Sequence, residues 1–488
     1  MAEHTNENTR AKITPNKINN HMYEIPMTGD MKVPVWIFTD EKMLKQMMED
    51  NCLRQGVNVA CLPGIYKASI MMPDAHQGYG FSIGGVAAID FEKGCISPGG
   101  IGFDINCGVR LLTTPLKKED VEPKIKELLE SLFKNVPSGV GSENFIRLTD
   151  QQLNDVLNRG AEWAVEQGYG TKDDLYRCEE GGKMKEADAS KVSPRAKARG
   201  REQLGTLGSG NHFLEIQYVD EIYDEKIAKA FGITEKGQVT IMIHCGSRGL
   251  GHQVCSDYLR RMEEEDPELA KSLPEKDLIY AKSGSKTAND YFGAMAASAN
   301  FAWANRHIIA HQVRKSLKEV LGIEPEQIKA VYDVAHNIAK IEEHMIDGEK
   351  RKVYVHRKGA TRSLPPFDEN VPEVYKEIGQ PVIIPGSMGT SSYLLVGTKT
   401  ALDVSFGSTA HGAGRVMSRT SAIHQFRGED VKRDLEKQNI FVKAASWKGI
   451  SEEAPAVYKD IDAVVKVSHD AGIGNLVVKV RPIGVIKG

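Results

Sequence analysis

Residues 99–108, which read GGIGFDINCG, constrain this chain more than any other stretch. They place a carboxylate, Asp104, three residues before a thiol, Cys107, in a loop dense with glycine. Glycine permits backbone turns that a Cβ would forbid, so both side chains can reach one cation. Such a pair alone is more often a tight turn with a buried structural cysteine. The loop therefore predicts a metal site only if distant parts of the chain supply further ligands.

Four histidines lie in similar short apolar and glycine-rich contexts. They are His212 in GSGNHFLE, His244 in IMIHCGSRG, His336 in VYDVAHNIAK and His411 in STAHGAGR. Each one alone would more often be a packed core residue than a ligand. Because all four stand next to turn residues, we interpret them as parts of one site that is assembled from distant loops.

The expected metal ligands combine hard, borderline and soft atoms, which suits Mn, Zn, Fe or Co and does not suit Mg or Ca. Five ligands exceed a closed tetrahedral site, so either two ions share them or one position stays open for substrate. A bridging thiolate, deprotonated by the metal, would explain a lone cysteine at this place. The five expected ligands are Asp104, Cys107, His212, His244 and His336.

Size and composition are typical of a large intracellular protein, and the length alone would permit two to four domains. The 488 residues carry a net charge of −3, so a polyanion can bind only at a local basic patch. Seven cysteines without a CxxC pair argue against a disulfide framework. There is no apolar run long enough for a membrane span and no signal peptide, so we expect a soluble, cytoplasmic protein.

The candidate loops run from Asp104 to His411, so any domain boundary between them would divide the site. We therefore predict a single α+β domain over residues 1–488, with a polar tail at 1–20 and mixed sheets, helices and loops around a central pocket. The charged segment 172–201 lacks periodicity and is predicted to be an exposed excursion. The strands expected most clearly are 33–38, 238–244, 330–334, 352–356 and 381–384, and the helices 41–49, 117–136, 151–167, 257–273 and 288–321.

Two glycine-rich loops, 385–390 (PGSMGT) and 408–415 (STAHGAGR), leave backbone N–H groups free to bind phosphate. Neither loop matches the usual nucleotide-binding patterns. His411, among small residues and near Arg415, could attack a phosphorus atom. The alternatives are a sixth metal ligand or a general acid or base.

Basic residues in turn and motif regions would complete a path for a phosphate backbone, although such runs are usually solvated surface. These residues are Arg248, Arg306, Arg357, Lys358, Arg362, Arg415 and Arg419.

Other candidates are less clear. His307 and His311 have the spacing of a zinc helix but lack its glutamate, and we interpret them as helix-surface residues. For Asp74, His76 and His252 the sequence leaves open whether they support the site or only form hydrogen bonds within their loops.

The chain closely resembles the RtcB family of RNA-splicing ligases, through PDAHQG, GGIGFDINCGVR, GSGNHFLE, HCGSRGLGHQ, NFAWANR, DVAHN, HRKGATR, PGSMGT, STAHGAGR and the final IKG. The resemblance implies the distinctive RtcB-type fold. It also implies a GTP- and Mn(II)-dependent ligase that joins a 2′,3′-cyclic phosphate or 3′-phosphate end of RNA, such as a tRNA half, to a 5′-hydroxyl end. An activating protein such as archease is a possible partner.

By the same resemblance, His411 is the residue that becomes guanylylated, and the five residues above hold two Mn(II) ions. The GMP then passes to the RNA 3′ end before the ends are joined. The implied nucleotide-binding residues are Asn211, His212, Phe213, Leu214, Glu215, His336, Asn337, Pro385, Gly386, Ser387, Met388, Ser392, His411, Gly412, Ala413, Gly414, Tyr458 and Lys487.

Base chemistry favours guanine at such a site. The Glu215 carboxylate can accept the N1–H and N2–H₂ donors of guanine, and Lys487 can donate to the base edge, whereas adenine presents the wrong pattern. Two other functions remain open from the sequence: a two-metal phosphoesterase with His411 as general acid, and a non-catalytic RNA-binding subunit.

Overall fold

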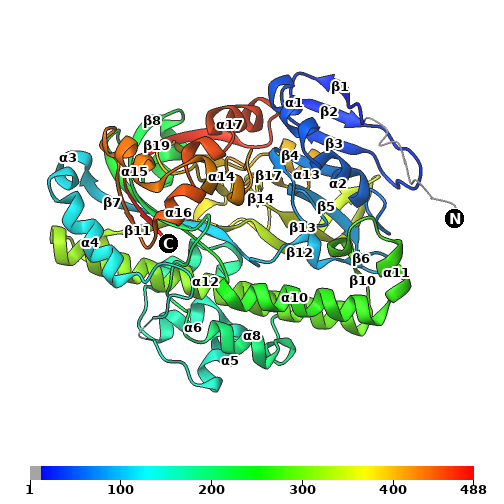
Figure 1. Cartoon of the computed structure of the whole chain (residues 1–488), viewed down its shortest axis with the longest axis horizontal. Coiled ribbons are helices and arrows are strands. Elements are labelled where there is room, and N and C mark those ends of the chain that lie inside the picture. Colours follow the sequence, from blue (N-terminus) through cyan, green and yellow to red (C-terminus); the bar gives the residue numbers. More distant parts are fainter. Residues whose placement is uncertain (1–12, 145) are drawn as a thin grey trace.

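Two large sheets carry the fold in the computed structural model, which describes residues 13–144 and 146–488 (Figure 1). The first sheet has the strand order β1-β2-β3-β4-β5-β13-β12, and the central sheet has the order β11-β7-β9-β8-β19-β16-β15, with β18 beside β19. Two short pairs, β6–β10 and β14–β17, complete the strands among the described residues. With the surrounding helices this is the single large α+β domain that the sequence predicts.

The strands of the first sheet are β1 (Asn16–Asn19), β2 (Met22–Ile25), β3 (Val35–Phe38), β4 (Ser69–His76), β5 (Ile83–Asp90), β12 (Asn337–Ile346) and β13 (Glu349–Lys358). Those of the central sheet are β7 (Gly108–Lys117), β8 (Phe213–Ile222), β9 (Gln238–Cys245), β11 (Lys329–Ala335), β15 (Pro381–Ile384), β16 (Ser392–Val396), β18 (Phe441–Ala444) and β19 (Asn475–Lys487). The short pairs are β6 (Cys95–Ile96) with β10 (Ala281–Lys282), and β14 (Ala360–Arg362) with β17 (Ser408–Ala410).

The α-helices are α1 (Glu41–Glu49), α2 (Cys52–Val59), α3 (Lys118–Val121), α4 (Ile125–Asn135), α5 (Asp150–Arg159), α6 (Ala161–Glu166), α7 (Lys172–Tyr176), α8 (Pro194–Gly200), α9 (Glu225–Ala230), α10 (Arg248–Glu265), α11 (Pro267–Ser272), α12 (Lys286–Leu321), α13 (Lys399–Ser405), α14 (Arg419–Gln425), α15 (Gly428–Glu436), α16 (Trp447–Glu452) and α17 (Ile461–Asp470).

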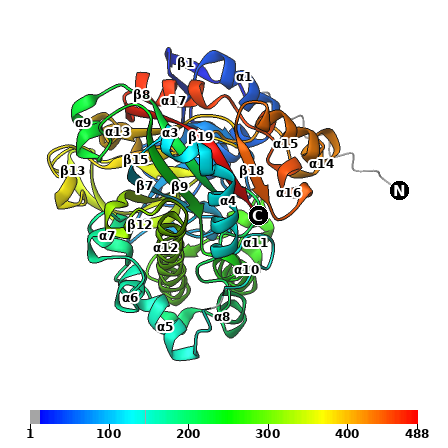
Figure 2. The same cartoon turned by 90° about the vertical axis from the view of Figure 1, so that its left-hand side faces the viewer.

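The longest helix, α12, supports the central sheet. Figure 2 shows it nearly end-on, below β7 and β9. The Ser285 side chain caps it by accepting from the N–H of Ala288, and Gly322, at φ 71°, ends it. Because α12 is buried on nearly all sides along most of its length, its sequence is rich in alanine and other apolar residues. The predicted helix over 288–321 is confirmed.

The expected strands at 33–38, 238–244, 330–334, 352–356 and 381–384 are confirmed as β3, β9, β11, β13 and β15, and the helix at 41–49 is confirmed as α1. Asp40 starts α1 by accepting from the N–H of Met43 at 2.7 Å. The helix predicted over 257–273 begins earlier: α10 starts at Arg248, within the glycine-containing stretch that looked like a loop.

The segment 172–201 is not an exposed excursion, and that prediction is wrong. It forms α7, α8 and short 3₁₀ turns; the turns at Glu179–Gly182 and Ala189–Lys191 pack against α12, and α8 packs against α10. Asp174 accepts two hydrogen bonds of 2.7 Å from Arg314, and the N–H of Met184 donates to Asn300 at 2.8 Å. Polar contacts from another helix hold these short elements, so the segment shows no hydrophobic period of its own.

The polar tail predicted at 1–20 is only partly testable, because residues 1–12 lie outside the described residues. Asn16–Asn19 forms β1, an exposed edge strand that pairs with β2. A polar sequence is compatible with this strand because none of its residues faces the core.

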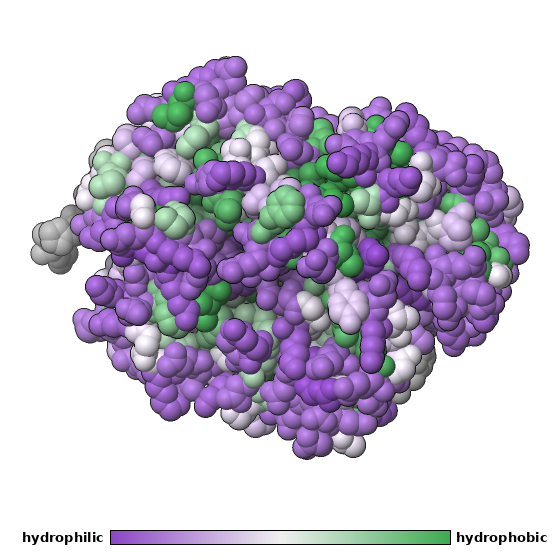
Figure 3. Space-filling view, turned by 180° about the vertical axis from the view of Figure 1, so that it is seen from behind, coloured by the Kyte–Doolittle hydropathy of each residue, from purple (hydrophilic) through white to green (hydrophobic). Residues whose placement is uncertain are grey.

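The surface is mostly polar, as the sequence without a long apolar run predicts. On the face shown in Figure 3, polar side chains cover most of the area and apolar ones appear in patches between them. Within 13–144 and 146–488, no helix combines the length and apolar character that a membrane crossing requires.

Candidate metal and nucleotide site

The expected metal ligands meet at one edge of the central sheet. His336 follows β11, Cys107 precedes β7, His244 lies near the end of β9, and His212 precedes β8. These four strands are antiparallel neighbours, so the end of one strand lies beside the start of the next. The sheet order therefore brings together residues that are far apart in the sequence.

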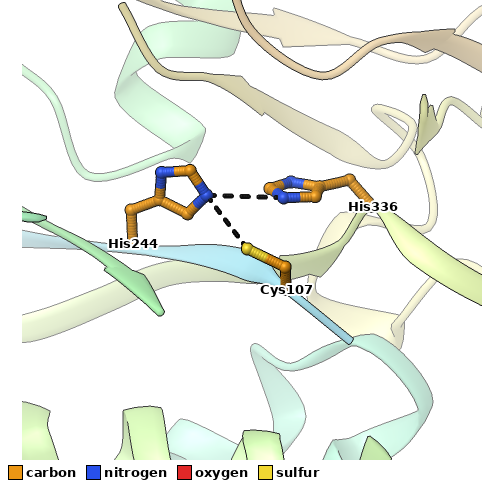
Figure 4. A group of neighbouring side chains, drawn as sticks. All are labelled: Cys107, His244 and His336. Carbon is orange, nitrogen blue, oxygen red and sulfur yellow. Dashed lines mark hydrogen bonds between the residues drawn. The ribbon is translucent and has the colours of Figure 1, made fainter. Parts of the chain in front are cut away.

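The ligand atoms are close enough to share cations (Figure 4). Cys107 Sγ lies 3.3 Å from His244 Nε2. The same sulfur lies 3.5 Å from His212 Nε2. His244 Nε2 lies 3.4 Å from His336 Nε2, and Asp104 Oδ2 lies 2.7 Å from His212 Nε2. The five residues thus form two triads, Cys107/His244/His336 and Asp104/Cys107/His212, that share the Cys107 sulfur.

The protonation states suit metal binding. Burial and the neighbouring histidines hold the pKa of His244 and of His336 well below the usual value, so both rings are neutral. Burial alone would raise the pKa of Asp104, but the adjacent His212 has the larger net effect and lowers it below the usual value. Asp104 is therefore a carboxylate. Burial raises the pKa of Cys107 to about 11, and a bound cation would remove that proton.

The orientation of His212 also fits. Its Nδ1 lies 3.1 Å from the carbonyl oxygen of Leu207, which can accept an Nδ1–H. Burial alone would lower the pKa of His212, but Cys245 and Asp104 raise it well above the usual value, so Nε2 is protonated in the metal-free protein. A bound cation would displace that proton, and Nε2 faces the other ligands, as in many metal sites. The donor set and its orientation therefore fit a transition metal.

His411 lies beside this cluster, directly after β17, and its ring centroid is 4.9 Å from that of His336. Asp74, fully buried in β4, accepts from His411 Nδ1 at 2.6 Å, from the His411 N–H at 2.9 Å and from the Gly412 N–H at 3.2 Å. Burial would raise the pKa of Asp74, but the contacts with His411 lower it. The carboxylate fixes the imidazole with Nδ1 as donor, which leaves Nε2 free. The sequence left the role of Asp74 open, and the structure makes it the partner of His411.

One pocket of 450 Å³ connects the ligand cluster to the two glycine-rich loops. This volume is typical of small-molecule sites. His76 and His252, whose role the sequence left open, also line it. The expected site residues that line it are Asp104, Cys107, Asn211, His212, Phe213, His244, His336, Asn337, Pro385, Gly386, Ser387, Met388, His411, Gly412, Ala413, Gly414, Tyr458 and Lys487.

Three expected nucleotide-binding residues, Leu214, Glu215 and Ser392, lie behind the pocket wall. Leu214 points into an apolar core because side chains alternate along β8. Ser392 Oγ accepts from the Gly386 N–H at 3.0 Å and so supports the 385–390 loop. Glu215 is buried, which raises its pKa to about 8; its Oε2 accepts from Gln217 at 2.7 Å, and its Oε1 has no hydrogen-bond partner among the described residues.

Sequence reasoning missed Glu453, a buried carboxylate in the pocket wall. It lies 3.0 Å from Arg415 and 3.5 Å from Lys487, and it accepts from the Tyr458 hydroxyl. Glu453 is the second of two adjacent glutamates in SEEAPAVY, and nothing in that stretch indicates that it lines a pocket.

The predicted basic path is wrong for three of its seven residues. Arg306, Arg357 and Arg362 are fully buried in the fold. Arg306 pairs with Asp333 at 2.7 Å, and Arg357 pairs with Glu342 at 2.5 Å. A buried guanidinium needs a carboxylate, and the sequence does not show which arginines have one. The four that do line the pocket are Arg248, Lys358, Arg415 and Arg419.

The helix-surface interpretation is wrong for His307, which is fully buried on α12. Its Nδ1 lies 3.0 Å from Arg110, and its Nε2 lies 2.9 Å from the carbonyl oxygen of Tyr169. His311 is only partly exposed and has an edge contact with Tyr169. Neither histidine belongs to the metal cluster.

The partly buried Asp104 and the buried cysteine and histidines beside a carboxylate-held histidine are suited to metal-assisted chemistry in this pocket. A family model described as tRNA-splicing ligase RtcB matches residues 55–488. A tRNA-splicing ligase RtcB of Pyrobaculum aerophilum is 57% identical over 97% of this chain and 99% of its own length. Another from Thermococcus kodakarensis is 54% identical over 98% of this chain and 100% of its own length. The chain therefore belongs to the RtcB family.

Proposed function

We propose that this protein is a GTP- and Mn(II)-dependent RNA ligase, in tRNA splicing and RNA repair. It joins a 2′,3′-cyclic phosphate or 3′-phosphate end to a 5′-hydroxyl end through a histidine–GMP intermediate and a guanylylated RNA 3′ end. The observation that supports this most directly is the position of His411, whose Nδ1 is bonded to Asp74 and whose ring contacts the metal-ligand cluster. Membership of a family of tRNA-splicing ligases supports RNA as the substrate.

Asp104, Cys107, His212, His244 and His336 would hold two Mn(II) ions, with Cys107 shared between the two triads. The metal would offset the negative charge of the phosphates and polarise them toward attack. All five are protein side chains of a kind that Mn(II) accepts together with phosphate oxygens.

His411 is the proposed nucleophile. Asp74 keeps Nδ1 as the donor, so Nε2 carries the lone pair and attacks the α-phosphorus of GTP. A nitrogen–phosphorus bond forms, and the bond from that phosphorus to the departing pyrophosphate breaks. Asp74 also stabilises the positive charge that develops on the ring.

The RNA then takes GMP from His411. Water first opens any cyclic phosphate to a 3′-phosphate, whose oxygen attacks the phosphorus on His411 and releases the imidazole. The 5′-hydroxyl oxygen attacks the activated RNA 3′-phosphorus and expels GMP. Arg248 lines the same pocket and can offset the developing charge.

The nucleotide would lie between the loops 385–390 and 411–414. Gly386, Gly412 and Gly414 line the pocket, so the backbone of both loops lies close to the proposed phosphates. The Gly386 and Gly412 N–H groups donate to Ser392 and Asp74, and these bonds hold the two loops in place. Lys487, whose Nζ donates to the carbonyl oxygen of Gly210 at 2.8 Å, and Tyr458 line the pocket at the place proposed for the base. The proposed nucleotide-binding set is Asn211, His212, Phe213, Leu214, Glu215, His336, Asn337, Pro385, Gly386, Ser387, Met388, Ser392, His411, Gly412, Ala413, Gly414, Tyr458 and Lys487.

We further propose that residues 1–488 act as one catalytic domain, because residues from His76 to Lys487 line one pocket. A reducing, cytoplasmic location agrees with the seven free cysteines. Archease remains the proposed activating partner.

Incubation with α-labelled GTP and Mn(II), followed by a denaturing gel, tests this function. We expect acid-labile label on the wild-type protein and none on His411→Ala, whose fold should be intact because the side chain lies at the pocket surface. Label that persists on the variant would move the nucleophile elsewhere. Hydrolysis of RNA or nucleotide without GTP, and without any covalent label, would favour a two-metal phosphoesterase instead.

A further inference from the structure

We propose that Tyr79, Phe103 and His252 form an aromatic platform that stacks on the nucleobase at a single-stranded RNA end. The proposal rests on the RNA ligase function above and adds the residues that hold the RNA. All three side chains line the same pocket as the metal-ligand cluster, although none of them is among the expected ligands.

The three rings form a continuous aromatic row. The Tyr79 and Phe103 centroids are 6.1 Å apart with an interplanar angle of 87°, and Phe103 stacks on His252 at 6.1 Å and 24°. The rings come from three separate parts of the chain: the β4–β5 loop, the loop that holds Asp104, and the N-terminal part of α10. Tyr79 is 65% exposed, so much of its ring is open to a ligand.

The loop that carries Tyr79 is held rigidly although its ring is exposed. The buried Gln55 side chain accepts from the Gly78 N–H and donates to the Gly78 carbonyl oxygen, both at 2.9 Å. The buried Lys358 donates to the carbonyl oxygens of Tyr79 and of Phe81. Gly80 has φ 70°, and a Cβ there would lie 2.5 Å from the backbone of Asp277. A fixed loop with an exposed ring is preorganised for binding.

The platform lies next to the chemistry. Phe103 directly precedes Asp104, so a base on the platform belongs to a nucleotide whose terminus can reach the ligand cluster. Arg248 and Lys358 line the same pocket and can offset phosphate charge. Stacking accepts every base because each has a π face, which suits an enzyme that joins RNA ends of different sequence.

The test compares RNA strands with and without the terminal base. Each 3′-phosphate strand and each 5′-hydroxyl strand is made in a normal form and in a form whose terminal nucleotide is abasic, and the KM and Kd are measured for each. Wild-type protein should bind the normal form of one strand about 5- to 100-fold more tightly than the abasic form. In Tyr79→Ala this difference should shrink toward one, whereas Tyr79→Phe should retain it. Whichever strand shows the effect is the one that the platform binds.

Tyr176→Ala is the matched control, because Tyr176 is also 65% exposed but does not line this pocket. It should retain the wild-type difference. The proposal is overturned if wild-type protein binds normal and abasic strands equally, or if Tyr79→Ala weakens both forms by the same factor.

Self-labelling with GTP needs no RNA and separates this proposal from the proposed function. If wild-type protein is not labelled, the ligase mechanism fails, and the Kd values still decide whether the platform binds a base. If Tyr79→Ala loses labelling and ligation in the same proportion, with an unchanged KM for RNA, the ring acts on the nucleotide step and the platform is rejected.

Discussion

Two buried polar clusters include residues in or next to the same two strands, β7 and β11. They differ in whether the polar atoms have complementary partners within the protein. Cys107 and His336, at the edge of β7 and β11, belong to the ligand cluster, and Arg110 and Asp333, three residues away on the same strands, belong to an internal ion-pair network. In the network, Asp333 lies 2.7 Å from Arg110 and 2.7 Å from Arg306.

In the ion-pair network, hydrogen-bond donors face hydrogen-bond acceptors. Arg306 also donates to the carbonyl oxygens of Asn106 and Cys245 at 2.8 and 2.7 Å, and Arg110 donates to the neutral ring of His307. In the ligand cluster, by contrast, atoms of the same kind face each other: His244 Nε2 and His336 Nε2 are 3.4 Å apart. A cation would satisfy both nitrogens at once. A buried cluster in which two nitrogens of the same kind face each other is therefore the one that indicates a ligand.

The largest effect should come from Cys107→Ala. Because the sulfur is common to both triads, we expect Mn(II) binding and RNA ligation to be lost together, while the stability of the metal-free protein changes by about 1 kcal/mol. Metal content by mass spectrometry and a ligation assay measure this. Cys255→Ala, at another buried free cysteine, should retain both. Full activity with unchanged metal content in Cys107→Ala would remove Cys107 from the site.

Asp333→Ala should lower the free energy of unfolding by about 3–5 kcal/mol, because Arg110 and Arg306 would remain buried without their carboxylate. The matched variant in the ligand cluster, Asp104→Ala, should cost only about 1 kcal/mol in metal-free protein, since one hydrogen-bonded carboxylate is lost from a partly exposed position. Urea unfolding of both variants, in the absence of metal, measures the difference. Equal losses would mean that both clusters are structural.

The smallest effect should come from Glu215. Its buried Oε1 has no hydrogen-bond partner among the described residues, so it too can accept a hydrogen bond from a ligand. We expect Glu215→Ala to weaken the preference for GTP over ATP by about tenfold, as the loss of one base contact of about 1.4 kcal/mol would. Glu453→Ala provides the comparison, because Glu453 lines the pocket directly. Competition between labelled GTP and unlabelled ATP measures both. If only Glu453→Ala loses the preference, the base contact belongs to Glu453.

Much of the fold follows from local patterns. The residue patterns over 41–49 and 288–321 and the apolar runs of β9 and β15 predicted these helices and strands, because the periodicity of burial is a local property. The segment 172–201 failed because polar side chains on α12 hold it, and such contacts leave no period in the sequence.

The candidate site was predicted in a similar way. Glycine-rich loops with single histidines indicated five ligands, and the structure brings all five together, although their metal and nucleotide roles stay predictions. The partnership of Asp74 with His411, the place of Glu453 and the row of rings at Tyr79 had no local signal, because each depends on contacts between separate segments of the chain.

The sequence by itself determined which residue types stand in the flexible glycine-rich loops, and hence which side chains could serve as ligands. Only the tertiary structure decided that Arg306, Arg357 and Arg362 are internal supports and that Arg248 and Lys358 face the pocket. The physical reason is that a charged side chain acts on a ligand only if no buried carboxylate already neutralises it, and the order of the strands in the sheets determines which charges meet.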